Sequence, residues 1–166
     1  MRHLLIVVLL AAPAFARPLE GLPLPRDRAF MIKAASDGMA EVKLAQLAMD
    51  RASKPEVKAF AKKMIDDHTQ AGSELQALAT REGVALPSEP TTEAMETYGR
   101  LERLSGETFD KAYLEAMCRD HDKAVIEFGR ESAEGSDPAV KAFANKTLLV
   151  IKQHDDLAHA DRSQVN

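Results

Sequence analysis

Four residues with metal-ligand side chains lie near the middle of four separate apolar patterns in this sequence. They are one glutamate and three histidines, namely Glu41, His68, His121 and His154. Carboxylate oxygens and imidazole nitrogens together suit divalent cations such as Zn, Fe, Mn or Cu. An ionised carboxylate in an apolar core is costly unless it has a partner. The four residues therefore predict either a site for one divalent ion or a metal-free polar cluster, in which Glu41 accepts hydrogen bonds from the imidazoles.

Several residues close to the histidines in sequence could support such a site. Asp67, Asp120 and Asp155 each flank a histidine, and carboxylates often fix the tautomer of a ligating imidazole. The sulfur-bearing side chains near the same helical faces are Met64, Met117 and Cys118. Thioethers would favour copper. Methionine at helical spacing is more often core filler, and a buried thiol is more often inert.

Four long amphipathic patterns would position these residues. Apolar side chains recur every three or four positions over residues 27–52, 55–82, 106–133 and 138–160, which is the spacing of an α-helix with one buried face. An α-helix rises about 1.5 Å per residue, which gives the distance of each polar residue from the turn that joins its helix to the next. These distances differ by about one helical turn between Glu41 and His68, and by about one turn between His121 and His154. All four side chains can therefore meet in one core.

The connections between these helices predict the topology. Ser53 lies three residues before Glu56, which is the spacing of a capping box, and Ser136 opens the last helical pattern in the same way. Both connections are short, so each pair of helices forms an antiparallel hairpin. Residues 83–105 join the two hairpins and include a short helix over 91–104. Two hairpins joined by one long crossover form a ferritin-like four-helix bundle.

The two hairpins also resemble each other. Residues 53–63 and 136–146 share Val, Lys, Phe, Ala and Lys at the same spacing. This internal repeat predicts that one hairpin was duplicated and that a pseudo-two-fold axis relates the copies.

The remaining segments indicate export. Residues 1–16 have a basic start, a short apolar run and a small-residue cleavage site, which together predict a secretory signal peptide. Residues 17–26 contain three prolines and a glycine and are expected to be a tether. The bundle domain would then occupy residues 27–160 and a tail residues 161–166. We expect a protein of the bacterial periplasm or cell envelope.

Composition excludes some partners. The chain has 22 basic and 26 acidic residues, a net charge of −4, and the basic residues form no stripe, so nucleic acid is not expected to bind. No spanning segment is expected after signal cleavage. Cys118 is the only cysteine, so the chain can form no internal disulfide. An envelope protein or a second copy of the chain remains a possible partner.

The order of these motifs resembles a known family. The similar segments are residues 34–42, the run around Asp67 and His68, the run around Phe109 and Tyr113, and residues 147–154. In these segments the chain resembles bacterial ferritin-like domains of unknown function, family 4142, which are often labelled predicted outer membrane proteins. The resemblance implies a ferritin-like bundle and export, and it implies no settled activity. Di-iron bundles use Glu-x-x-His motifs, and this chain has none. Di-iron oxygen chemistry is therefore not expected.

Two functions follow from these patterns. One is an exported bundle that binds a divalent metal ion through the four core residues. The alternative is a non-catalytic envelope or stress-associated protein whose polar core holds no metal. Acid–base catalysis at the same cluster is less favoured, because the sequence has no nucleophile elbow, phosphate loop or cofactor fingerprint.

Overall fold

The computed structural model describes residues 25–165, apart from the side chains of residues 93 and 94. The predicted signal peptide, residues 1–16, lies outside the described residues, as do residues 17–24 of the predicted tether and residue 166 of the predicted tail. None of the helices in the described part is long and apolar enough to span a bilayer.

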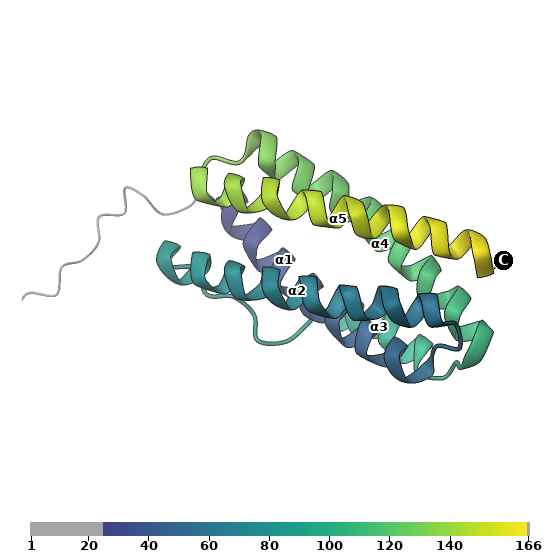
Figure 1. The fold of residues 1–166 in the computed structure, drawn as a ribbon. Coiled ribbons are helices and arrows are strands. Elements are labelled where there is room, and N and C mark those ends of the chain that lie inside the picture. Colours follow the sequence, from purple (N-terminus) through teal and green to yellow (C-terminus); the bar gives the residue numbers. More distant parts are fainter. Residues whose placement is uncertain (1–24, 166) are drawn as a thin grey trace, which may run out of the picture.

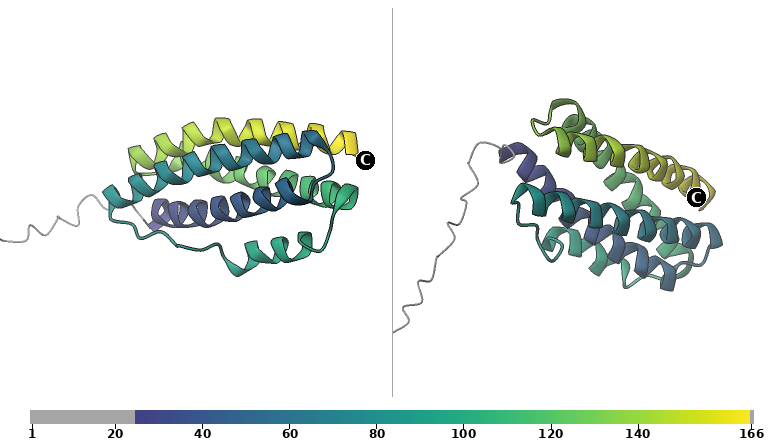
Figure 2. Two further views of the ribbon diagram at one scale, coloured as in Figure 1. Left: turned by 60° about the horizontal axis from the view of Figure 1, so that its bottom comes forward. Right: turned by 60° about the vertical axis from the view of Figure 1, so that its left-hand side comes forward.

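The described chain consists of five helices and has no strand (Figure 1). The helices are α1 (Pro25–Arg51), α2 (Pro55–Glu82), α3 (Thr92–Leu101), α4 (Gly106–Glu134) and α5 (Pro138–Val165). The α1–α2 and α4–α5 pairs are antiparallel hairpins, and α3 lies in the crossover, packed against α1 and α4 (Figure 2). The predicted ferritin-like four-helix bundle with a long crossover is confirmed.

The helix ends differ from the predicted limits at a few places. Helix α1 begins at Pro25, inside the predicted tether, because proline in the first turn needs no hydrogen-bond acceptor for its nitrogen. Helix α5 continues beyond residue 160 as far as Val165, which packs against the core. Residues 161–165 are thus part of the last helix rather than a separate tail.

Two buried aspartates fix the hairpin turns, and each comes from the other hairpin. Asp110 of α4 accepts hydrogen bonds from the backbone nitrogens of Ser53 and Lys54, at 3.0 and 3.1 Å, and from the Ser53 hydroxyl. Asp27 of α1 accepts hydrogen bonds from the backbone nitrogens of Ser136 and Asp137, at 3.0 and 2.8 Å. Both aspartate side chains are fully buried. Each hairpin therefore holds the turn of its partner.

The predicted capping box at Ser53 is wrong. The N-cap of α2 is Lys54, which makes no side-chain cap hydrogen bond, and the Ser53 hydroxyl donates to Asp110 instead. At the start of α5, Asp137 acts as the cap, because its Oδ1 accepts hydrogen bonds from the Ala139 and Val140 nitrogens.

Buried apolar side chains form two clusters, one towards each end of the bundle. The larger includes Val57, Phe60, Met64, Phe109, Tyr113, Leu114 and Met117. The smaller includes Met31, Leu75, Leu78, Val140 and Phe143. Along each long helix, the predicted site residue falls between the residues of these two clusters. The polar residues therefore occupy a layer in the middle of the bundle, with apolar packing on both sides.

Candidate metal centre

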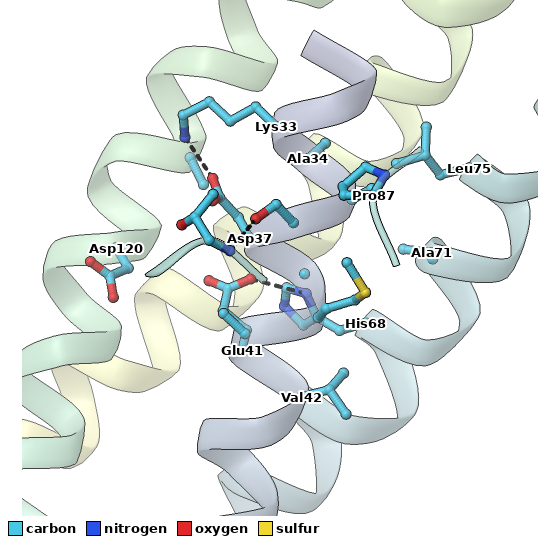
Figure 3. A pocket seen from close by; sticks show the side chains of 18 of the residues that line it. Lys33, Ala34, Asp37, Glu41, Val42, His68, Ala71, Leu75, Pro87 and Asp120 are labelled. Atoms are coloured by element: carbon cyan, nitrogen blue, oxygen red, sulfur yellow. Dashed lines mark hydrogen bonds and ion pairs between the residues drawn. The ribbon is translucent and has the colours of Figure 1, made fainter. Parts of the chain in front are cut away.

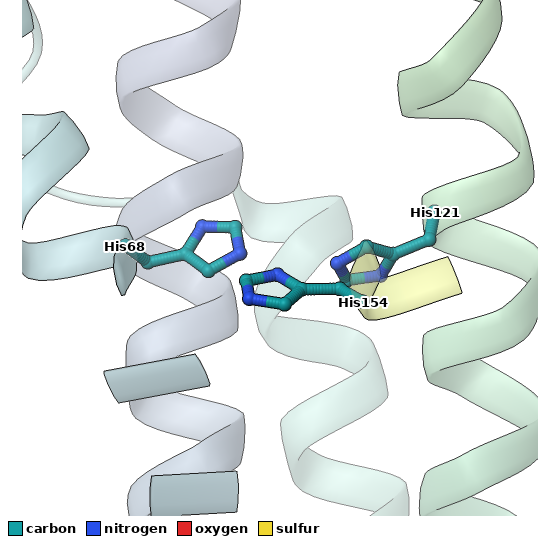
Figure 4. Close-up of side chains that lie close together, drawn as sticks. All are labelled: His68, His121 and His154. Carbon is teal, nitrogen blue, oxygen red and sulfur yellow. The ribbon is translucent and has the colours of Figure 1, made fainter. Parts of the chain in front are cut away.

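Three histidines from three helices meet in this polar layer. His68 of α2, His121 of α4 and His154 of α5 lie close together (Figure 4). One ring nitrogen of each lies within 4.8 Å of the others. The ring centroids of His154 lie 5.3 Å from those of His68 and 5.4 Å from those of His121. The structure thus brings together three of the four residues that the sequence predicted to share one core.

Glu41 of α1 lies beside the three histidines. Its Oε2 lies 3.1 Å from His68 Nδ1, and its Oε1 lies 3.8 Å from His121 Nδ1 (Figure 3). Glu41 is not among the residues whose ligand atoms lie within 4.8 Å of one another. In this conformation the carboxylate holds the imidazoles rather than completing a four-atom ligand set.

Each imidazole has one nitrogen with a partner and one without. His68 Nδ1 faces Glu41, His121 Nδ1 lies 3.0 Å from the Met117 carbonyl oxygen, and His154 Nε2 lies 2.7 Å from Asp67 Oδ2. These oxygens are acceptors, so the proton of each neutral ring belongs on the nitrogen that faces them. The opposite nitrogens, His68 Nε2, His121 Nε2 and His154 Nδ1, are buried and have no hydrogen-bond partner.

Burial sets the charge of the cluster. It lowers the pKa of His68 to about 4 and that of His154 to about 4, and it also lowers the pKa of His121. The side chains of His121 and His154 are 0 % exposed. Burial likewise raises the pKa of Glu41 to about 7. Near neutral pH the three imidazoles are therefore uncharged, which is the form that coordinates metal ions.

Two cavities reach the cluster. One of about 1600 Å³ is lined by Glu41, His68 and His121, together with Asp120 and residues of the crossover (Figure 3). The other, of about 70 Å³, lies between α2 and α5 and is lined by Asp67, His68 and His154. The histidines are thus bordered by cavities on two sides of the bundle.

The other predicted supporting residues divide into two groups. Asp67 contacts a histidine, but it is His154 on another helix rather than the neighbouring His68, and Lys63 Nζ lies 2.8 Å from the same carboxylate oxygen, Oδ2. Met117 contributes its carbonyl oxygen to His121. The Met64 and Met117 side chains both lie in the larger apolar cluster.

Asp120 and Cys118 lie apart from the histidine rings. Asp120 pairs with Arg119 at 3.3 Å and lines the large cavity. Cys118 is 1 % exposed, and the charged groups that affect its thiol are Arg162, Asp122 and Asp155. Burial raises the pKa of the Cys118 thiol, so it stays protonated near neutral pH.

Sequence reasoning missed Lys63 and the Met117 carbonyl. It also missed that Asp155, considered only as a neighbour of His154, forms a second group of ligand-type side chains with Asp122 and His159. The signals were the intervals of four residues from Lys63 to Asp67 and from Asp155 to His159, which place each pair on one face of a helix. No comparable signal marks a backbone carbonyl.

The fold and the central histidines define a ferritin-like helical bundle with a buried imidazole cluster. Residues 12–160 match the model of DUF4142, a domain of unknown function, and the chain belongs to this family. None of the curated proteins compared with the chain matches it.

Several solved structures share the fold at low sequence identity. A DUF305 fragment from Deinococcus radiodurans has a TM-score of 0.76 at 15 % identity, covering 86 % of this chain and 99 % of that one. A candidate secreted DUF305 protein from Streptomyces coelicolor has a TM-score of 0.73 at 15 % identity, covering 84 % and 92 %. CopM in its Cu(II)-bound form has a TM-score of 0.69 at 14 % identity, covering 84 % and 97 %.

Proposed function

We propose that this protein is an exported metal-binding bundle that holds one transition-metal ion between His68, His121 and His154. The observation that carries the proposal is the set of three buried, unpartnered imidazole nitrogens described above. A buried polar atom without a partner costs about 1–3 kcal/mol. An ion that accepts three nitrogen lone pairs removes this cost at all three atoms.

The opposite sides of the rings support the same proposal. Glu41, the Met117 carbonyl and Asp67 each face the nitrogen that would not bind the ion. In metal sites such acceptors fix the tautomer and the orientation of the ligating imidazole. Glu41 lies beside the cluster and, when ionised, offsets part of the charge of a divalent ion.

Copper is the metal that we expect to bind most tightly. A site of three imidazoles binds Cu²⁺ with higher affinity than the other divalent first-row ions. The structural neighbour CopM is described in both Cu(II)-bound and Cu(I)-bound forms. A binding role, rather than catalysis, is the function that the cluster supports. The predicted signal peptide and the candidate secreted neighbour from Streptomyces coelicolor favour an extracytoplasmic location.

A metal-free polar core is the second candidate. Each imidazole already has one acceptor, so the layer could serve only to fix the relative positions of the helices. In that case the protein is a structural or partner-binding component of the envelope.

Thermal unfolding with and without Cu²⁺ separates the two candidates. A site filled at one hundred times its dissociation constant stabilises the wild-type fold by about 2.7 kcal/mol. The double variant His68→Leu/His154→Leu should lose this Cu²⁺-dependent rise, while its metal-free form should melt at or above the wild-type temperature, because buried polar atoms are removed. Thr147→Val, which changes another partly buried residue of α5 that lines both cavities, should keep the rise.

The opposite result supports the polar-core function. If wild-type protein purified from its own host contains no metal, and neither Cu²⁺ nor Zn²⁺ changes its melting temperature, the metal proposal is wrong.

A further inference from the structure

A second group of ligand-type side chains lies on the outer seam between α4 and α5. Asp122 of α4 and Asp155 and His159 of α5 place one ligand atom each within 4.8 Å of one another. His159 Nε2 lies 3.4 Å from Asp122 Oδ1 and 3.5 Å from Asp155 Oδ1. One imidazole and two carboxylates from two rigid helices thus converge on one point.

One oxygen in this group makes no hydrogen bond, although His159 Nε2 lies 3.5 Å from it. The Asp155 side chain is 22 % exposed, yet its Oδ1 is shielded from solvent and has no hydrogen-bond partner. A shielded carboxylate oxygen is costly without a donor or a cation. It is also the oxygen that faces His159 Nε2. A cation between these atoms would satisfy it.

The seam is separate from the central histidines. Asp122 and Asp155 directly follow His121 and His154 in the sequence. Successive residues of a helix point about 100° apart. The histidines therefore face the core, where they are 0 % exposed, and the aspartates face outward, with the Asp122 side chain 59 % exposed.

We propose that Asp122, Asp155 and His159 form a surface site for a divalent transition-metal ion, distinct from the central cluster. Two carboxylates and one imidazole match the ligand types that hold Zn²⁺, and they leave at least one position for water. An imidazole ligand disfavours Ca²⁺ and Mg²⁺, which prefer oxygen. The two negative charges of the carboxylates balance the charge of the ion.

Arg162 opposes this site and supplies a sharp test. Its Nη2 lies 3.3 Å from His159 Nδ1. Because arginine only donates, Nδ1 accepts there and the ring proton resides on Nε2, which is the atom that would bind the ion. Binding therefore requires Arg162 to move away. In Arg162→Gln the amide oxygen can accept from Nδ1–H, and this variant should bind Zn²⁺ about tenfold more tightly than wild type.

Equilibrium dialysis of the full mature chain with Zn²⁺ tests the proposal. With both sites present, wild type binds two ions, while His159→Gln and Asp122→Asn each bind one and keep the wild-type circular dichroism spectrum. Asp156→Asn, a change at an exposed neighbour, should still bind two. His68→Leu should also bind one, because it removes only the central ion.

The stoichiometries distinguish failure here from failure of the central site. If only the surface site exists, wild type binds one ion and His159→Gln binds none. The surface site is refuted if His159→Gln and Asp122→Asn, both folded, bind as many ions as wild type, or if Arg162→Gln leaves Zn²⁺ affinity unchanged.

Discussion

Asp67 of α2 accepts a hydrogen bond from His154 Nε2 of α5 at 2.7 Å, so a carboxylate of the first hairpin orients an imidazole of the second. Lys63, one turn earlier on α2, fixes the same carboxylate at 2.8 Å. This contact leaves His154 Nδ1 as the buried ring nitrogen without a hydrogen-bond partner. The two hairpins are thereby joined through the site itself.

Asp67→Asn should weaken Cu²⁺ binding about tenfold to a hundredfold, because the neutral amide fixes the His154 tautomer poorly. Competition with a Cu²⁺ chelator measures the change. Asp66→Asn is the matched control, since Asp66 forms the equivalent pair with Lys62 at 2.6 Å on the exposed face. Equal affinities of the two variants would show that Asp67 does not support a metal ligand.

Asp110→Ala should lower the free energy of unfolding by about 3 kcal/mol, because it leaves the Ser53 and Lys54 nitrogens of the first turn without an acceptor. Asp27→Ala should have a similar effect through the second turn. Urea unfolding measures both. Asp37→Ala removes only an exposed pair with Lys33 and should cost about 0.5 kcal/mol. If the Asp27 and Asp110 variants lose no more free energy of unfolding than Asp37→Ala, these hydrogen bonds to the turns are not major contributions to stability.

Gly135→Ala should destabilise the fold by about 1–3 kcal/mol. An added Cβ would lie 2.6 Å from the Glu131 carbonyl oxygen and 2.9 Å from Lys141 Cγ, so the backbone must shift. Gly72→Ala is the counterpart, since nothing lies within 4 Å of its added Cβ in the middle of α2. That change should raise the free energy of unfolding by about 0.5–1 kcal/mol. Thermal unfolding measures both variants. Two effects of the same sign would contradict this packing.

Glu131 should make the protein less stable as pH rises. Burial, followed by a hydrogen bond with Asp27, raises the pKa of Glu131 to about 6 from its usual 4.5. A raised folded-state pKa gives stability that is fully present below pH 4.5 and is lost as pH rises through 6.

Glu131→Gln keeps a donor for Asp27 and carries no charge. The variant should match wild type near pH 4.5 and exceed it by up to about 2 kcal/mol at pH 7.5. Urea unfolding at the two pH values measures the difference. A wild-type advantage at pH 7.5 would mean that the Arg26 pair, at 3.5 Å, outweighs burial.

The helices and the meeting of three histidines could be predicted because both depend on local order. Apolar spacing gives the buried face of each helix, and Glu41, His68, His121 and His154 interrupt those faces at similar heights. The meeting of the three histidines required only helix geometry and two tight turns.

The specific partners could not be predicted, because they depend on contacts between distant segments. Ser53 has the local signature of a helix cap, yet its hydroxyl donates a hydrogen bond to Asp110, which is distant in the sequence. Asp67 lies next to His68, yet the bundle turns it towards His154. One clue was present, since the interval from Asp27 to Ser53 equals that from Asp110 to Ser136. The duplication itself stays a prediction.

The exchange of caps between the hairpins has a consequence for how the molecule opens. Asp110 secures one end of the hairpin interface and Asp27 the other, with the histidine layer halfway between. If the two hairpins separated, two buried carboxylates and several backbone amide donors at the two ends would therefore lose their hydrogen-bond partners. Opening is then a concerted event with a high barrier, and an ion enclosed there should leave slowly through the side cavities rather than through parting of the halves.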